Sequence, residues 1–360
     1  MTTTIMLAGG GTGGHIFPAL ALREELLRRH PDWNFIFVGT KRGLEAEIVP
    51  RAGVVLEFLD IEGLIGRGWR SLRALMKLPF ALRGARALLR KYSPALVAGF
   101  GGYASFPLLW AASGQKIPTL IHESNLTPGF ANRCLAGRVN ARAAAFSTVQ
   151  EIWPDGAVTG MPVRAGFSLA EKIAPEKNAL RVLIAGGSRG AAGLNALVRA
   201  DLDALLAQPG VTITHQTGTA QHAQFAPLSQ SRANYSALPF ITDMPAAMAA
   251  ADLYIGRAGA STLAEITAAG LPAILVPFPA AAADHQTKNA GGMVQLGAAQ
   301  LLAERDFTPG ALAQIVKKLA SDPPRLVAMA AASAAAGKPD AAARLADLAE
   351  SLLAKSAVRA

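Results

Sequence analysis

The glycine-rich run at residues 9–14 constrains the fold of this chain more than any other feature. It follows an apolar stretch at residues 5–8 and precedes a helix-like sequence that begins near Phe17. A strand, a glycine loop and a helix in this order direct backbone N–H groups and a helix dipole toward an anion, usually a phosphate. The glycines also fit the G-x-G-x-x-G pattern, but residues 35–38 are not followed by the acid that would bind a ribose. The run is therefore predicted to bind an anion other than NAD.

The same arrangement recurs in the second half of the chain, where apolar residues 182–185 precede a glycine-rich run at residues 186–190. In each half short β-type stretches alternate with helix-like stretches, which is typical of parallel sheets covered by helices. We predict an α/β protein of two Rossmann-like, parallel-sheet domains that face each other across a cleft. The expected parts are an N-terminal domain at residues 1–160, a C-terminal domain at 161–340 and a closing helix at 341–360. The expected strands are residues 5–8, 35–38, 54–58, 96–98, 119–122, 143–146, 182–185, 212–215, 235–238, 253–255 and 273–276.

The composition excludes several classes of protein. Of the 360 residues 51% are apolar and only 17% are charged, so the chain is not disordered and is long enough for two packed cores. A single cysteine, Cys134, excludes an intrachain disulfide framework and favours a reducing compartment. The N-terminus does not look like a secretory signal, and the uncharged stretches at 92–115 and 266–283 are interrupted by glycine and proline. We therefore expect a soluble or peripheral protein without a membrane span.

Most of the net charge of +10 lies in one segment, residues 62–91, which holds eight basic residues and a single acid. Apolar residues are interleaved with these charges, as in a helix that lies on an anionic lipid surface. An ordinary surface helix with solvated arginines fits the pattern equally well, and no nucleic-acid module accompanies it. Pro79 is expected to split the segment. The candidates for membrane contact are Trp69, Arg73, Lys77, Phe80, Arg83, Arg86 and Arg90.

Two polar side chains near glycine-rich turns are candidates for chemistry. His15 directly follows the first glycine run, in the first helical turn, where the helix dipole disfavours an extra positive charge. Its imidazole is therefore expected to be neutral and able to accept a proton, although a histidine there could also only cap or pack. Thr262 and Glu265 have capping-box spacing, but Glu265 could instead accept hydrogen bonds from ribose hydroxyls.

Two further polar residues lie at expected loop positions. Asn125 follows the expected strand at 119–122, where its amide suits either a sugar or a turn, and Arg164 lies near the domain junction as a possible phosphate clamp. Asp201 and Asp203 match a cation-binding D-x-D, but the helical pattern around them is expected to place both acids outward. No histidine or cysteine spacing suits zinc. No metal is expected, so phosphate charge must be met by helix ends and arginine.

Eight motifs, in this order along the chain, together resemble one known family. They are residues 9–15, 101–105, 122–125, 162–164, 186–190, 240–244, 259–265 and 285–290. The family is the MurG family, glycosyltransferases of bacterial peptidoglycan synthesis. The resemblance implies a GT-B fold and inverting transfer of N-acetylglucosamine from UDP-N-acetylglucosamine to the muramic 4-hydroxyl of lipid I, which gives lipid II. It also implies peripheral attachment to the cytoplasmic face of the bacterial inner membrane, an anionic surface, with no cofactor and no nucleic-acid partner.

The resemblance also assigns roles to residues of this chain. Transfer of this kind needs a base that takes the proton of the acceptor hydroxyl, and His15 is the first choice for it. Tyr103 and Glu123 are candidates for the acceptor side. The residues implied to contact the donor are Thr12, Gly13, Gly14, Asn125, Arg164, Ser188, Ile241, Ala260, Ser261, Thr262, Leu263, Glu265 and Gln286. Ser124 and Arg189 stand where the family usually has glutamine. Two other functions remain open: an isomerase that acts on UDP-N-acetylglucosamine alone, and a nucleotide-binding regulator without chemistry.

Overall fold

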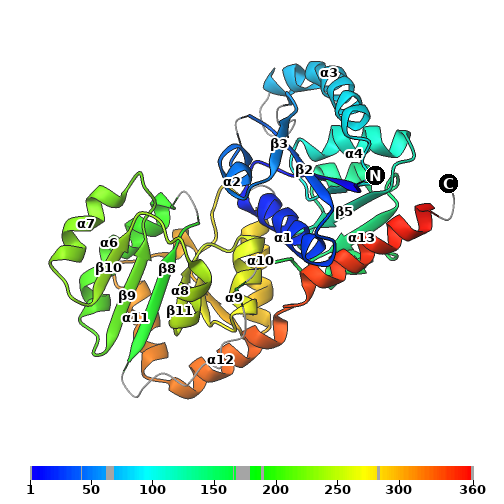
Figure 1. Cartoon of the computed structure of the whole chain (residues 1–360). Helices are drawn as coiled ribbons and strands as arrows, with labels where there is room; N and C mark the ends of the chain where they lie inside the picture. Colours follow the sequence, from blue (N-terminus) through cyan, green and yellow to red (C-terminus); the bar gives the residue numbers. More distant parts are fainter. Residues whose placement is uncertain are drawn as a thin grey trace. The chain divides into compact units, whose positions relative to one another are not determined.

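The computed structural model describes residues 2–41, 43–61, 69–164, 166–167, 179–187, 190–281 and 284–357 (Figure 1). Two compact units divide the chain. The first unit comprises Met1–Arg164 and Asp340–Ala360, and the second unit comprises Ala165–Pro339. Each unit is a parallel sheet covered by helices, which confirms the predicted α/β class.

The described strands of the first unit form a seven-stranded sheet in the order β3-β2-β1-β4-β5-β6-β7. Its strands are β1 (Thr4–Ala8), β2 (Asn34–Gly39), β3 (Val55–Phe58), β4 (Leu96–Gly99), β5 (Thr119–Glu123), β6 (Ala141–Ala144) and β7 (Ala157–Val158). Its helices are α1 (Gly13–Arg29), α2 (Glu45–Arg51), α3 (Trp69–Tyr92), α4 (Ser105–Gly114), α5 (Phe130–Leu135) and α13 (Ala341–Ala357), with a 3-10 turn η1 (Ser147–Glu151). Since every pair is parallel, the loops after β1, β4 and β5 meet at the carboxyl edge of adjacent strands.

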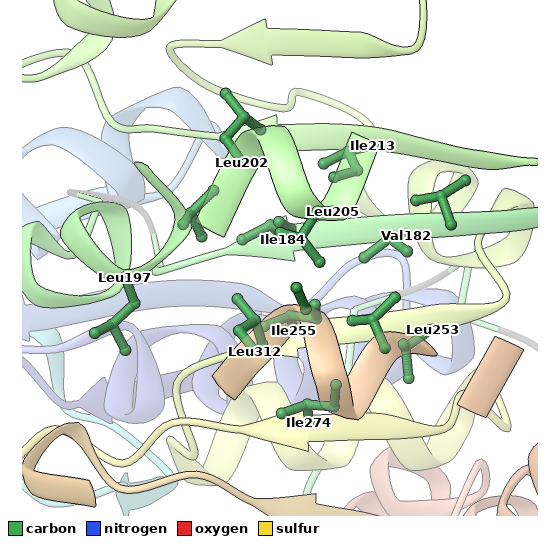
Figure 2. Close-up of a cluster of buried hydrophobic side chains, with 14 of the residues drawn as sticks. Val182, Ile184, Leu197, Leu202, Leu205, Ile213, Leu253, Ile255, Ile274 and Leu312 are labelled. Atoms are coloured by element: carbon green, nitrogen blue, oxygen red, sulfur yellow. The ribbon is translucent and has the colours of Figure 1, made fainter. Parts of the chain in front are cut away.

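The described strands of the second unit form a six-stranded parallel sheet in the order β10-β9-β8-β11-β12-β13. They are β8 (Leu180–Ala185), β9 (Val211–Gln216), β10 (Tyr235–Leu238), β11 (Leu253–Gly256), β12 (Ala273–Leu275) and β13 (Ala299–Leu301). The helices are α6 (Ala192–Leu206), α7 (His222–Gln230), α8 (Met244–Ala250), α9 (Ala260–Ala268), α10 (His285–Gln295), α11 (Ala311–Ala320) and α12 (Pro323–Ala336), with η3 (Glu304–Asp306). Figure 2 shows strand side chains such as Ile184 and Ile255 packed with Leu202 of α6 and Leu312 of α11 in the core of this unit.

The last helix returns to the first unit, and Figure 1 shows α13 beside α1. Its Leu345, Ala346 and Ala349 are buried in the same core as the side chains of β1 and α1. On the surface of this contact, Arg29 pairs with Asp347 and with Glu350, at 2.7 and 2.8 Å. The helix is thus an integral part of the first unit, although the whole second unit separates it from the rest in sequence.

Two local expectations are wrong. Pro79 does not split the basic segment, since α3 runs without a break from Trp69 to Tyr92. Asp201 does not face outward: it is buried, and its carboxylate accepts hydrogen bonds from the backbone N–H groups of Gly310 and Ala313 at the start of α11. The apolar pattern of α6 could not reveal this partner, which comes from more than a hundred residues along the chain.

Candidate active site

The first glycine loop, residues 9–12, connects β1 to the start of α1. One of its N–H groups is hydrogen-bonded to the side-chain carboxylate of Glu45. The Gly11 N–H donates to Glu45 Oε2 at 2.9 Å. Glu45 Oε1 accepts from the Thr40 N–H at 2.8 Å and from its hydroxyl at 2.7 Å. Glu45 begins α2 and is fully buried. Sequence analysis missed this residue because nothing in the sequence separates it from the exposed Glu47 two positions later.

His15 lies in the first turn of α1, as expected, and its ring is oriented by the loop before it. Its Nδ1 lies 2.8 Å from the Gly10 carbonyl oxygen, which can only accept a hydrogen bond. In the neutral ring the proton is therefore on Nδ1, and Nε2 keeps the lone pair. A Cβ added at Gly101 would lie 3.0 Å from Nε2, so this nitrogen lies against the loop after β4. The arrangement gives His15 the tautomer that a general base needs.

The loop after β4 packs directly on the first glycine loop. Gly102 has φ +82°, and a Cβ there would lie 2.6 Å from the Gly10 carbonyl oxygen, so only glycine allows this approach. Tyr103 follows and is 45% exposed, which leaves its ring available to a ligand. Arg164 lies at the end of the first stretch of this unit, with its guanidinium carbon 4.5 Å from the centre of the Phe17 ring. The structure thus gathers His15, Tyr103 and Arg164 around the start of α1.

The loop after β5 is organised by Glu123, which is buried. Its Oε1 accepts from the N–H and side-chain amide of Asn125 at 2.9 and 3.1 Å, and its Oε2 accepts from the Gly129 N–H and Asn132 at 2.9 and 2.8 Å. Each carboxylate oxygen accepts two hydrogen bonds, so Glu123 positions Asn125, and its place on the acceptor side stays a prediction. Asn125 keeps its side-chain oxygen for a ligand, whereas the Ser124 hydroxyl donates to the Gly14 carbonyl.

The second glycine loop follows β8, and Gln216 at the end of β9 joins it to the segment that holds Ile241. The Gln216 side-chain amide donates to the Gly187 carbonyl at 2.9 Å, and its oxygen accepts from the Ile241 N–H at 2.8 Å. Gln216 is buried, and so is Ile241. Gln216 was not predicted from the sequence, although the polar residues His215 and Gln216 at the end of a predicted strand were a usable signal. Ser188 and Arg189 lie outside the described residues.

Helix α9 begins at Ala260, and its N-cap is Gly259, which has no side chain with which to cap the first turn. The capping box of Thr262 and Glu265 is therefore not formed, because the helix starts two residues before Thr262. Ala260, Ser261 and Thr262 occupy the first turn, whose N–H groups point out of the helix end. The side chain of Leu263 is buried and its N–H donates to the Gly259 carbonyl, so its contact with the donor stays a prediction.

Glu265 and Gln286 are two further predicted donor contacts in helices of the second unit. Glu265 lies in the second turn of α9, partly buried; burial raises the pKa of Tyr254, and the charge of Glu265 adds to this rise. The side-chain oxygen of Gln286, at the start of α10, accepts from the Phe278 N–H at 2.9 Å. This bond fixes Gln286 and leaves its amide nitrogen for a ligand.

The acids of the D-x-D motif both have structural partners. The Asp201 carboxylate accepts hydrogen bonds from N–H groups at the start of α11, and Asp203 pairs with Arg232 at 2.7 Å. Within the described residues no group of three or more histidine, cysteine, aspartate or glutamate side chains could hold a metal ion.

The basic helix α3 presents a mixed apolar and basic face. Phe80 is 76% exposed and Met76 is 61% exposed, whereas Ala81, Ala85 and Leu89 are buried, the last two in a core that they share with strand side chains. Arg83, Arg86 and Arg90 are exposed on the outer side, and they make no ion pair with the described part of the chain. Lys77 pairs with Asp60 at 3.0 Å. The side chains of Trp69 and Arg73 lie outside the described residues. No helix in the described ranges is long and apolar enough to span a bilayer.

Comparisons with known proteins agree over both units. The N-terminal domain model of glycosyltransferase family 28 matches residues 5–144, and the C-terminal domain model of that family matches residues 181–345. A protein of Desulforudis audaxviator (strain MP104C) is 40% identical and covers 98% of this chain and 99% of its own length. It is named UDP-N-acetylglucosamine–N-acetylmuramyl-(pentapeptide) pyrophosphoryl-undecaprenol N-acetylglucosamine transferase.

Two solved structures are also similar. The crystal structure of Acinetobacter baumannii MurG is 32% identical with a TM-score of 0.80, covering 97% of this chain and 99% of its own. The calicheamicin glycosyltransferase, at 20% identity and a TM-score of 0.72 over 99% and 100% of the two chains, shares the fold alone. With matches that extend over nearly the full length of both partners, this chain has the GT-B fold and belongs to the MurG family of glycosyltransferases.

Proposed function

We propose that this enzyme transfers N-acetylglucosamine from UDP-N-acetylglucosamine to the 4-hydroxyl of the muramic residue of lipid I, which yields lipid II for peptidoglycan synthesis. The observation that carries the proposal is the 40% identity, over 98% of the chain, to a transferase named for this donor and acceptor. The geometry of His15 fits the chemistry, because its Nδ1–H is bonded to the Gly10 carbonyl and its Nε2 is the atom that can accept a proton.

In the proposed reaction, the muramic hydroxyl attacks the anomeric carbon of the α-linked donor and the bond to UDP breaks. Direct displacement inverts the configuration and gives a β1→4 bond. His15 Nε2 takes the hydroxyl proton as the new bond forms. The negative charge that develops on UDP is met by the N–H groups at the start of α9, while Glu265 accepts hydrogen bonds from the ribose. Thr12, Gly13, Gly14, Asn125 and Arg164 remain predicted donor contacts of the first unit.

One incubation separates this function from the two alternatives. The chain is mixed with UDP-N-acetylglucosamine, with and without a lipid I analogue, and both UDP release and the sugar nucleotide are measured. A transferase releases UDP only when the acceptor is present. An isomerase changes the sugar nucleotide without the acceptor, and a regulator binds the nucleotide without turnover; either result would overturn the proposal.

We propose that the transfer needs no divalent cation. Helix N-termini and arginine supply the positive potential for the diphosphate, and both acids of the D-x-D motif are already engaged by Gly310, Ala313 and Arg232. After exhaustive removal of divalent ions, UDP release should continue in EDTA. Complete loss of turnover in EDTA that magnesium or manganese restores would contradict this.

We also propose that α3 attaches the enzyme to the cytoplasmic face of the inner membrane. Exposed apolar side chains lie beside arginines there, and each basic residue near an anionic surface contributes about 1 kcal/mol. Reversal of Arg83, Arg86 and Arg90 to glutamate should abolish binding to anionic vesicles, as should high salt with the unaltered enzyme. Transfer to a membrane-embedded acceptor should fall far more than transfer to a short-chain soluble analogue.

A matched control reverses three exposed basic residues of the second unit, Lys317, Lys318 and Arg325, to glutamate. This variant has the same change in net charge and should still bind the vesicles. Unchanged vesicle binding by the α3 variant, with an intact circular dichroism spectrum, would reduce α3 to an ordinary solvated surface.

A further inference from the structure

A single peptide group connects Glu45 to His15. The carbonyl of the Gly10–Gly11 peptide accepts the Nδ1–H of His15 at 2.8 Å. The N–H of the same peptide donates to Glu45 Oε2 at 2.9 Å. A carboxylate, an amide and an imidazole therefore form one continuous hydrogen-bonded chain that ends at the free Nε2 of His15.

The hydrogen bonds around Glu45 match those of a carboxylate. Both of its oxygens accept, Oε2 from Gly11 and Oε1 from the N–H and hydroxyl of Thr40. Glycine stands at positions 10, 39 and 43, and a Cβ at any of the three would overlap this side chain. No cation within the described residues pairs with it. The fold thus encloses an acceptor-only group directly behind the loop that orients His15.

A charge at one end of such a chain acts on the other end. A carboxylate that accepts from an amide N–H draws negative charge onto the amide oxygen, which strengthens the bond that this oxygen accepts from Nδ1–H. The gain is larger once Nε2 has taken a proton and the ring is an imidazolium. In serine proteases an aspartate bonded directly to a histidine fixes its tautomer and stabilises its charged form. Here one peptide group is interposed between the acid and the histidine.

We infer that Glu45 is a positioning residue for the transfer reaction, which acts on His15 through the Gly10–Gly11 peptide. This inference rests on the proposed function and on His15 as its base. Glu45 fixes the peptide, the peptide fixes the Nδ1–H tautomer, and the carboxylate stabilises the imidazolium that forms when the acceptor hydroxyl loses its proton. Glu45 touches neither substrate.

Other charged or titratable groups near His15 also affect its protonation and are kept constant in the test. On the neighbouring elements they are Tyr103 in the loop after β4, Glu123 at the end of β5, and Arg164 against Phe17. On α1 itself the first charged side chain after His15 is Arg23, two turns further along the helix. None of these belongs to the hydrogen-bonded chain between Glu45 and His15.

The test compares Glu45→Gln with Glu47→Gln. Glu45→Gln keeps the shape of the side chain but removes its charge. It also places a side-chain NH₂ group opposite the N–H of Gly11 or the N–H and hydroxyl of Thr40, which are themselves donors. Glu47 lies on the same helix, is exposed, and pairs only with Arg51 among the described residues. Glu47→Gln therefore makes the same change in charge outside the hydrogen-bonded chain that joins Glu45 to His15. We expect kcat to fall by about 10- to 100-fold in Glu45→Gln, by analogy with the loss when a residue that orients a metal-ligating histidine is changed. Binding of UDP-N-acetylglucosamine should be unchanged, and Glu47→Gln should behave as the unaltered enzyme.

The pH profile gives the readout that a merely structural role would not move. Turnover rises with pH as the base loses its proton, and loss of the carboxylate should move this rise about one pH unit lower. In a His15→Ala background, Glu45→Gln should lower kcat no further. An unshifted profile, or an equal loss in both backgrounds, would overturn the inference. Should Glu45→Gln fail to fold, Glu45→Asp, which keeps the charge but retracts it, must lower kcat without weakening donor binding. If the unaltered enzyme releases no UDP with lipid I, the proposed function fails instead.

Discussion

The two glycine loops have similar sequences but opposite supports. In the first unit the Gly11 N–H donates to the carboxylate of Glu45. In the second unit the Gly187 carbonyl accepts from the amide of Gln216. One loop therefore rests on an anionic group, and the other rests on a neutral one.

We expect this difference to suit the first loop to orienting a base and the second to lying near a diphosphate. A carboxylate behind the first loop already satisfies one of its N–H groups and disfavours a phosphate nearby, whereas it favours a histidine that must become positive. A neutral amide behind the second loop adds no repulsion to a diphosphate. Glycine spacing reports how closely a backbone can approach a ligand, and we expect the charge of the supporting side chain to select which ligand binds there.

The largest effect expected from this comparison concerns the histidine beside Gln216. Unlike His15, His215 has both ring nitrogens engaged, Nδ1 with the Tyr235 hydroxyl and Nε2 with Asn195, and burial lowers its pKa to about 4. The unfolded chain binds the proton near pH 6.5, so the unfolded state gains protons first as the pH falls. The free energy of unfolding of the second unit should therefore have its highest value above about pH 6.5, and it should fall by about 3 kcal/mol as the pH drops to about 4.

The measurement can separate the two units. All four tryptophans belong to the first unit, so tryptophan fluorescence follows that unit, whereas circular dichroism follows both. His215→Gln should flatten the pH dependence of the dichroism transition between pH 6.5 and 4 and leave the fluorescence transition unchanged. Equal pH dependence with and without His215 would mean that its protonation is not coupled to folding.

His15 should show the reverse behaviour, with an effect on turnover and none on donor affinity. His15→Ala removes the proton acceptor, and loss of a general base lowers kcat by about 10²-fold or more. Affinity for UDP-N-acetylglucosamine, measured by calorimetry, should stay within about twofold. Near-normal turnover would remove His15 from the chemistry and, with it, the distinction between the two loops.

Glu265 tests the donor side of the comparison. Glu265→Ala leaves a stub that cannot accept hydrogen bonds from the ribose, and the loss of charge-assisted bonds should weaken donor binding by roughly 1.5–3 kcal/mol. Asp306→Ala, which removes an exposed acid of η3 in the same unit, serves as the control and should bind normally. Tight donor binding by Glu265→Ala would assign the ribose to another residue.

The smallest expected effect comes from exchanging the supports. Gln216→Glu places a carboxylate behind the second loop, where it can still accept from the Ile241 N–H but can no longer donate to the Gly187 carbonyl. Gln216→Met removes both hydrogen bonds without adding charge. We expect UDP-N-acetylglucosamine to bind Gln216→Glu about tenfold more weakly than Gln216→Met at low salt, because only the former repels the diphosphate. Uridine, which has no phosphate, should not show this order. If uridine and the sugar nucleotide respond alike, the charge of the support does not select the ligand.

The sheets were predictable because their central strands are buried on both faces and are apolar runs bounded by glycine and polar residues. The strands β7 and β13 were missed, since two or three residues at a sheet edge carry no period to recognise. Pro79 was misjudged because a proline does not always end a helix: α3 continues past it, and Ala81, Ala85 and Leu89 in the half that follows are buried.

The candidate site was predictable only in part. His15 and Asn125 follow strand ends within a few residues, so local sequence places them at the sheet edge. Glu45 and Gln216 act through partners 34 and 29 residues away, and no local pattern reports a contact at that separation. Leu263 was assigned to the donor together with the rest of its motif, residues 260–265, and only the structure shows that α9 begins at Ala260, which decides which N–H groups of the motif remain available.

The return of α13 to the first unit sets an order of events during protein synthesis. Leu345, Ala346 and Ala349 complete a core whose other side chains come from the beginning of the chain. At about 5–20 residues per second, roughly 10–35 s pass between the emergence of Arg164 and that of Asp340 from the ribosome. Throughout that interval the first unit has an open apolar surface beside α1, while the second unit has all of its own residues available to fold. The part of the enzyme made first is therefore the last to be completed.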